Sequence, residues 1–219
     1  MKQFFRFSAL LLVCLLSACG VQTTQGGDGG ATETVNAQVI ISDSTVAVTI
    51  KSDTAVLADI FIFNENYNPV TKIGFCDSIT GVSTDSNAVF QSLSGKYNLL
   101  ILERFSQKSL LFNSVSAGAL LSDTIDDTLC PEGSIEGKVI FRDPYNIDKN
   151  LVRVYLKGTF YHTGTDSDGT FQMQQIPKGT YLLNAMISTS KNSPERSVGM
   201  EVQIKSSLKT NSGTLFFSE

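Results

Sequence analysis

The chain has 219 residues, of which 42% are hydrophobic and 17% are charged, and its formal net charge is −4. A chain of this length accommodates one large or two small domains. Removing residues 1–18, which contain two basic and no acidic groups, leaves a net charge of about −6. This negative charge argues against nucleic acid as a partner and against electrostatic attachment to anionic lipid.

Residues 1–18 have the composition of an export signal. Lys2 and Arg6 give a positive start, residues 9–16 are apolar, and Leu-Ser-Ala-Cys follows at residues 16–19. The apolar run is about half of the roughly 20 residues that span a bilayer, which disfavours a transmembrane helix. An ordinary secretory signal followed by an unrelated cysteine is the alternative.

The motif at residues 16–19 closely resembles the bacterial lipobox, whose cysteine becomes the lipidated new N-terminus. The resemblance implies that Cys19 carries two or three acyl chains such as palmitate. Several chains give stable attachment, whereas a single chain binds a membrane only reversibly. Gly20 stands where an aspartate retains lipoproteins at the inner membrane. We therefore expect a lipid-anchored protein of the cell envelope, located at the outer membrane.

The cysteine count leaves one pair in the exported chain. Cys14 departs with the signal and Cys19 takes lipid, so Cys76 and Cys130 remain. In an oxidising envelope these two predict a disulfide, which in the chain-entropy model would contribute about 4 kcal/mol. Two separate buried thiols are the alternative. With one histidine and no close cysteine spacing, the sequence predicts no metal site.

The remaining pattern is typical of an all-β protein. Residues 19–34 are polar and glycine-rich, which indicates a flexible tether. Beyond them, apolar and polar residues alternate along residues 135–141, 152–157 and 198–205, as in antiparallel sheets with one buried face. Residues 60–63 (Ile-Phe-Ile-Phe) are apolar on both faces and predict a central strand.

A weak internal repeat suggests two similar sandwiches. Residues 84–90 match residues 165–171 at an offset of 81, and each copy is followed by a glycine and a tyrosine, at Gly95/Tyr97 and Gly179/Tyr181. The predicted organisation is therefore a signal peptide (1–18), a lipidated tether (19–34), a degenerate β-sandwich (35–130) and a second β-sandwich (131–219).

The second half resembles the carboxypeptidase regulatory-like family. The likeness lies in residues 134–139, 151–156 and 165–171 and in Ile-Pro-Lys-Gly-Thr-Tyr at 176–181, and it covers residues 134–205. It implies a transthyretin-like (prealbumin-like) antiparallel β-sandwich, so that the whole chain would hold two in tandem. Members of this family usually serve as accessory domains, so the resemblance implies a structural or binding role and no enzyme activity.

The segment around Gly169 is interpreted first as a structural turn. Asp168-Gly169 is a tight-turn pair, and Phe171 and Tyr181 should point inward. Asp166, Asp168 and Thr170 also place oxygens at alternate positions, as a calcium loop does, but an acidic residue further on is missing. We expect a plain hairpin.

Two rival functions remain open. A glycan-binding module would use exposed aromatics, for which Tyr155 and Tyr161 on one polar sheet face are the candidates. A hydrolase of unfamiliar type would use His162, the only histidine, with the nearby Asp166. The sequence has no Gly-x-Ser-x-Gly elbow, and His162 reads better as a solvent-facing strand residue. We predict no catalytic residues and no cofactor, with an envelope protein or glycan as the partner besides the membrane.

Overall fold

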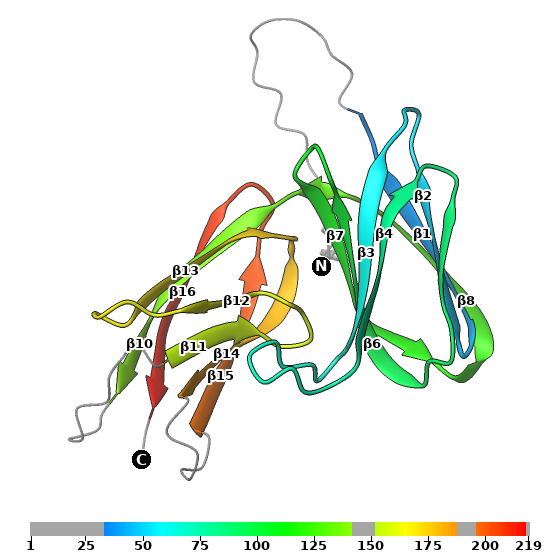
Figure 1. Cartoon of the computed structure of the whole chain (residues 1–219). Helices are drawn as coiled ribbons and strands as arrows, with labels where there is room; N and C mark the ends of the chain where they lie inside the picture. The colour runs from blue at the N-terminus through cyan, green and yellow to red at the C-terminus, as the bar shows by residue number, and fades with distance from the viewer. Residues whose placement is uncertain (1–32, 142–151, 188–195, 218–219) are drawn as a thin grey trace, which may run out of the picture. The chain divides into compact units, whose positions relative to one another are not determined.

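The computed structural model describes residues 33–141, 152–187 and 196–217 (Figure 1). Within these ranges every regular element is a β-strand, sixteen in all. The same ranges contain no helix with the length and apolarity to cross a membrane. The predicted all-β fold is confirmed.

The first eight strands form two sheets. They are β1 (Asn36–Asp43), β2 (Thr45–Lys51), β3 (Leu57–Asn64), β4 (Cys76–Ser83), β5 (Asn87–Phe90), β6 (Gly95–Glu103), β7 (Lys108–Ala117) and β8 (Ala119–Thr128). One sheet has the order β5-β2-β1-β8. The other has the order β4-β3-β6-β7 and gains the short strand β9 (Cys130–Pro131) beside β7. All neighbours in both sheets are antiparallel.

The remaining strands form two further sheets. They are β10 (Gly133–Phe141), β11 (Val152–Leu156), β12 (His162–Gly164), β13 (Thr170–Ile176), β14 (Gly179–Ile187), β15 (Arg196–Ile204) and β16 (Lys209–Phe217). The sheet orders are β13-β10-β16 and β12-β11-β14-β15. Only β10 and β16 are parallel among the described strand pairs.

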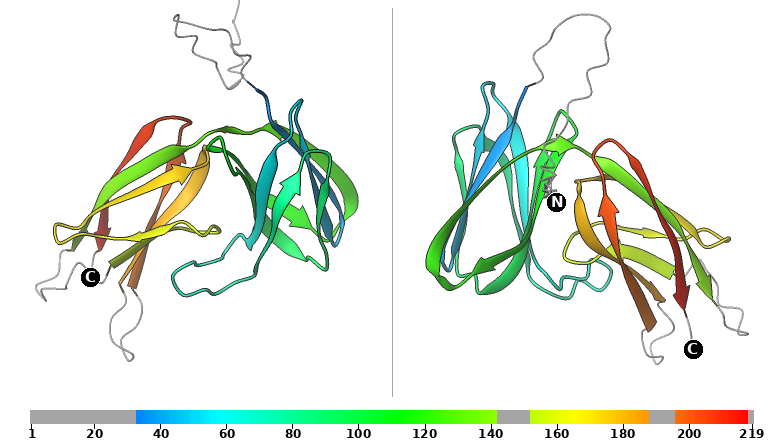
Figure 2. Two further views of the ribbon diagram at one scale, coloured as in Figure 1. Left: turned by 45° about the horizontal axis from the view of Figure 1, so that its top comes forward. Right: turned by 180° about the vertical axis from the view of Figure 1, so that it is seen from behind.

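The two halves repeat one pairing pattern. In the first half β2 pairs with β5, and β3 lies between β4 and β6, which pairs with β7. In the second half β10 pairs with β13, and β11 lies between β12 and β14, which pairs with β15. The matched sequences at residues 84–90 and 165–171 thus lead into β5 and β13, which hold equivalent places. Figure 2 shows the strands of both halves from two further sides.

The first half has one strand more than the second. β16 pairs directly with β10, whereas β1 lies between β2 and β8 and pairs with both. Because β2 and β8 are each antiparallel to β1, they are parallel to one another, as β10 and β16 are. The extra strand is therefore an insertion into a shared arrangement, and it is the first strand to follow the predicted tether.

Equivalent tyrosines fix the start of β6 and β14. The hydroxyl of Tyr97 donates to the backbone carbonyl of Ser94 (2.9 Å), and that of Tyr181 donates to the carbonyl of Pro177 (2.8 Å). Both rings are buried. Each hydroxyl therefore satisfies a carbonyl of the turn that precedes its own strand.

The buried apolar residues divide into two clusters. The first contains residues between 35 and 129, including the inward rows of β1 and β2. The second contains residues between 135 and 217 together with Phe63, Tyr67, Leu100 and Leu111 from the first half. The domain boundary near residue 130 stays a prediction, since the second cluster takes residues from both sides of it.

The sheet that contains β3 and β6 is apolar on both faces. Ile60 and Ile62 point into the first cluster, whereas Phe61 and Phe63 point toward the second. β3 has a neighbour on each side, which confirms the predicted central strand. Because each face of β3 packs against an apolar cluster, all four of residues 60–63 are apolar.

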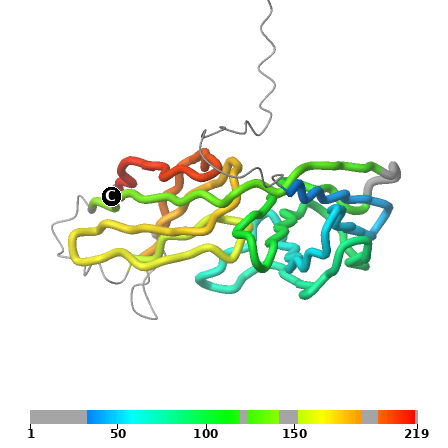
Figure 3. Tube along the Cα trace, turned by 90° about the horizontal axis from the view of Figure 1, so that it is seen from above, coloured from blue at the N-terminus to red at the C-terminus, as the bar shows by residue number. Residues whose placement is uncertain are grey.

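The passage from one half to the other is fixed by backbone hydrogen bonds. The amide of Glu132 donates to the carbonyl of Gln107 (3.1 Å), and the amide of Ser207 donates to the carbonyl of Glu132 (3.1 Å). A Cβ on Gly133 would lie 2.3 Å from the backbone oxygen of Lys205, so only glycine fits at the start of β10. Figure 3 follows the chain through this passage in green.

Candidate functional site

The predicted lipidation site lies outside the described residues. Cys19, the signal peptide and the tether up to residue 32 belong to the part of the chain that the structure leaves undescribed. Lipidation of Cys19 therefore stays a prediction, and the described sites are those of the β-structure.

The predicted disulfide between Cys76 and Cys130 is wrong. Cys76 is a free, exposed cysteine at the start of β4, and Cys130 is buried on β9. β4 and β9 are the opposite edges of a five-stranded sheet, about four strand spacings or 19 Å apart. A disulfide needs Cα atoms within about 7 Å. Counting cysteines could not reveal this separation, because it depends on strand order.

The environment of Cys76 includes Tyr67. Burial raises the pKa of the Tyr67 hydroxyl, and hydrogen bonding and charge interaction with Cys76 raise it further. Tyr67 belongs to the second apolar cluster. The thiol therefore lies at an exposed sheet edge beside a largely buried phenol.

His162 lies where the sequence predicted. It is exposed on β12, and its Nδ1 lies 3.0 Å from the carbonyl oxygen of Phe160. The expectation of a solvent-facing strand residue is confirmed.

The aromatic platform that the rival glycan-binding hypothesis needs at Tyr155 and Tyr161 is absent, because both side chains are buried. Val152, Val154 and Leu156 are buried as expected, but Tyr155 on the opposite face of β11 is also buried, at 7% exposure. Asn68 covers it, with its Nδ2 donating to the Tyr155 hydroxyl (3.2 Å). Tyr161 is 9% exposed within the second cluster. Long-range packing from the first half, which alternation along β11 cannot reveal, removes Tyr155 from solvent, whereas Arg153 on the same face stays exposed.

Asp166 organises the turn that precedes β13. Its Oδ1 accepts hydrogen bonds from the amides of Asp168 (3.0 Å) and Thr170 (2.8 Å), and its Oδ2 accepts from the Thr170 hydroxyl. These bonds, first of all those from Thr170, lower the pKa of the Asp166 carboxyl. The carboxylate thus serves as a turn clamp.

The turn at Gly169 has the predicted conformation, but the two strands that it connects do not pair with each other. Gly169 adopts a φ of 81°, as expected for a tight-turn glycine, and Phe171 and Tyr181 point inward. The flanking strands β12 and β13 belong to different sheets, so this is a crossing turn and not a hairpin. The described part of the chain contains no group of three or more His, Cys, Asp or Glu residues placed to hold a metal ion.

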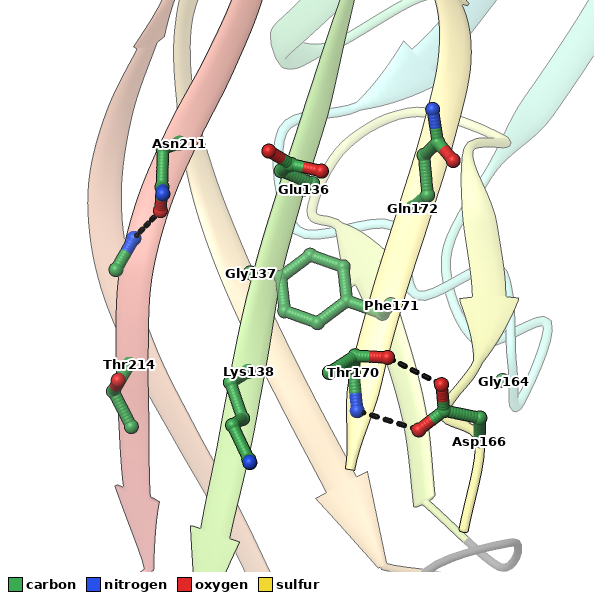
Figure 4. A pocket seen from close by; sticks show the side chains of 11 residues that line it. Glu136, Gly137, Lys138, Gly164, Asp166, Thr170, Phe171, Gln172, Asn211 and Thr214 are labelled. Atoms are coloured by element: carbon green, nitrogen blue, oxygen red, sulfur yellow. Dashed lines mark hydrogen bonds between the residues drawn. The ribbon is translucent and has the colours of Figure 1, made fainter. Parts of the chain in front are cut away.

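An open pocket of about 710 Å³ lies on the outer face of the β13-β10-β16 sheet (Figure 4). Polar side chains from all three strands line it. They are Glu136 and Lys138 on β10, Thr170 and Gln172 on β13, and Asn211 and Thr214 on β16, with Asp166 at one end.

Irregular pairing between β10 and β16 shapes this pocket. The register shifts between Glu136 and Lys138, and Gly213 opposite has a φ of 79°. A Cβ on Gly137 would overlap the Ser212 hydroxyl and lie 2.7 Å from the Phe171 ring beneath. Because Gly137 has no side chain, the Phe171 ring can pack closely against the backbone of β10 at this position.

The polar groups of this pocket are largely engaged with one another. Glu136 forms an ion pair with Lys209 (2.5 Å), and the side-chain oxygen of Asn211 accepts from the amide of Gly213 (2.8 Å). The residues that line it include no histidine, cysteine or serine. The Thr170 hydroxyl, which also lines the pocket, donates to the Asp166 carboxylate as part of the turn that precedes β13.

Comparisons with known proteins give distant likenesses. No family model and no curated protein sequence matches the chain. Among solved structures, the Bacillus anthracis TIE protein matches 87% of this chain at 9% identity and a TM-score of 0.30, and the chain spans 42% of it. BcpA, the major pilin subunit of Bacillus cereus, matches 83% of this chain at 12% identity and a TM-score of 0.28, with 71% of its own length covered. A variant of that subunit matches with a TM-score of 0.29. At these scores the likenesses carry no inference about function.

Proposed function

We propose that this chain is a lipid-anchored protein of the bacterial cell envelope, whose β-structure has a structural, accessory or binding role without catalysis of its own. The observation that carries the proposal is Leu-Ser-Ala-Cys at residues 16–19, which follows a short apolar run and a positive start. Acylation of Cys19 would attach the chain to a membrane, and Gly20 favours the outer membrane.

The use of polar groups in the β-structure supports a scaffolding role. Asp166 clamps a turn, and Asp59 forms an ion pair with Arg104 (2.7 Å). The hydroxyls of Tyr97 and Tyr181 bind backbone carbonyls. These side chains thus hold turns and strands in place.

Metabolic labelling tests the anchor. Cells that express the full chain are grown with radiolabelled palmitate, and the protein is recovered from the membrane fraction. We expect label in the parent and in the Cys14→Ser control, because residue 14 leaves with the signal. Cys19→Ser should carry no label and should be soluble or keep its signal. A labelled Cys19→Ser protein, or an unlabelled parent, would contradict the proposal.

A further inference from the structure

A second pocket, here named the junction pocket, lies where the chain passes from the first half to the second. It has a volume of about 380 Å³, near the lower end of the roughly 300–1,000 Å³ typical of small-molecule sites. Its lining comes from three regions. The first half contributes Asp59 on β3, the end of β6 and the β6–β7 turn, the passage itself contributes Glu132, and the second half contributes Phe160, Tyr161, Gln174 and Gln175.

A β-bulge brings two adjacent glutamines to this pocket. Ser134 pairs with Gln174 and Gly133 pairs with Ile176, so Gln175 is the extra residue on β13. Its φ is 57°, a left-handed conformation that side-chain-bearing residues rarely adopt. Regular alternation would send the two side chains to opposite faces, but both are exposed and both line the pocket. The bulge thus brings the side-chain amides of both Gln174 and Gln175 to the pocket.

One wall of the pocket is aromatic. Phe160 is half-buried, and its ring lies 5.2 Å from Phe61 and 4.5 Å from Tyr161, centre to centre. Burial, followed by the nearby charge of Glu132, raises the pKa of Tyr161, so its hydroxyl stays protonated. These rings combine an apolar surface with one hydroxyl.

The part of the lining that comes from the first half is mostly polar. Arg104 binds both carboxylate oxygens of Asp59, with Nε to Oδ1 at 2.9 Å, Nε to Oδ2 at 3.1 Å and Nη2 to Oδ1 at 2.7 Å. This fork geometry holds the guanidinium in place. Burial raises the pKa of the nearby Glu132 carboxyl. Three carboxyl groups against one arginine make the pocket unfavourable for anions.

We propose that the junction pocket binds a neutral sugar residue. Amide side chains both donate and accept hydrogen bonds, which suits vicinal hydroxyls, and the half-buried Phe160 ring suits the apolar face of a pyranose ring. The proposal goes beyond membrane anchoring, which would persist if the pocket were empty. It also places the binding surface away from Tyr155, which is buried.

Ligand-observed saturation-transfer NMR tests the proposal on the mature lipoprotein in detergent micelles. The probes are glucose, galactose, mannose and N-acetylglucosamine, with cellobiose, lactose, mannobiose and chitobiose. We expect saturation transfer to at least one of them. Gln174→Ala and Gln175→Gly should each weaken its binding about tenfold, the loss of roughly one hydrogen bond.

The two variants separate a ligand contact from a folding defect. Glycine accepts a positive φ without strain, so Gln175→Gly should keep or raise the melting temperature while it removes the amide. Gln172→Ala is the matched control, since Gln172 is exposed on the same strand but lines the other pocket. It should bind like the parent. No saturation transfer from any probe, or equal binding by Gln175→Gly and the parent, would overturn the proposal.

Discussion

Leu99 and Leu100 are adjacent on β6 and fully buried, but they belong to different apolar clusters. Leu→Ala at a fully buried site costs about 3–5 kcal/mol. For a cooperative unit of nearly 190 residues, a loss of about 3 kcal/mol lowers the melting temperature by roughly 6–12 °C. We expect Leu100→Ala to act on the second cluster, although its own strand belongs to the first half.

Hydrogen–deuterium exchange with calorimetry measures this effect. Leu100→Ala should accelerate amide exchange in β11 and β14, whose side chains belong to the second cluster. Leu99→Ala, the same substitution one residue earlier, should act first on β1 and β2, which belong to the first cluster. If Leu100→Ala left exchange in β11 and β14 unchanged, the assignment of Leu100 to a core shared by both halves would be refuted.

Three further predictions concern single groups. In the native chain iodoacetamide should alkylate exposed Cys76 and spare buried Cys130, and a peptide that joins the two in mass spectra without reductant would contradict the strand order. Tyr97→Phe and Tyr181→Phe each remove a hydrogen bond to a turn carbonyl. Urea denaturation should therefore show that each lowers the free energy of unfolding by about 1 kcal/mol. An unchanged free energy of unfolding in either variant would show that its bond contributes nothing. Burial raises the folded-state pKa of Glu132, so its ionisation opposes folding as the pH rises through that value. Glu132→Gln should therefore raise the melting temperature at pH 7, and the gain should shrink as the pH falls from the raised folded-state pKa toward 4.5. A pH-independent gain would contradict this.

Local patterns predicted much of the fold correctly. The alternation at residues 198–205, the central strand at residues 60–63 and the tight turn at Gly169 all depend on neighbours in sequence, and all are present. Such features follow from side-chain period and backbone sterics, which a single sequence contains. The equivalence of β5 and β13 was likewise visible as a repeated turn sequence.

The errors arose where distant segments meet. The pairing of Cys76 with Cys130 depended on which strands lie side by side, and the exposure of Tyr155 depended on a loop from the other half of the chain. Composition and spacing contain neither relation. The insertion of β1 between β2 and β8 was also missed, because residues 36–43 have no counterpart in the second half with which to compare them.

The junction pocket had one sequence signal that went unused. Gln174-Gln175 interrupts the alternation of β13, since two polar residues stand together between Met173 and Ile176. A break of this kind is the usual mark of a bulge, and bulges often occur at binding sites. The other lining residues include Asp59 and Arg104 from the first half, which lie far earlier in the chain, so only folding brings them together with the glutamines.

Mass spectrometry of the mature N-terminus tests the central claim most directly. The full chain is expressed in a bacterium with lipoprotein processing, extracted from membranes with detergent and digested. The account predicts an N-terminal peptide that begins at Cys19 and carries the mass of a diacylglyceryl group, with or without a further acyl chain. An unmodified peptide that begins at another residue would contradict it.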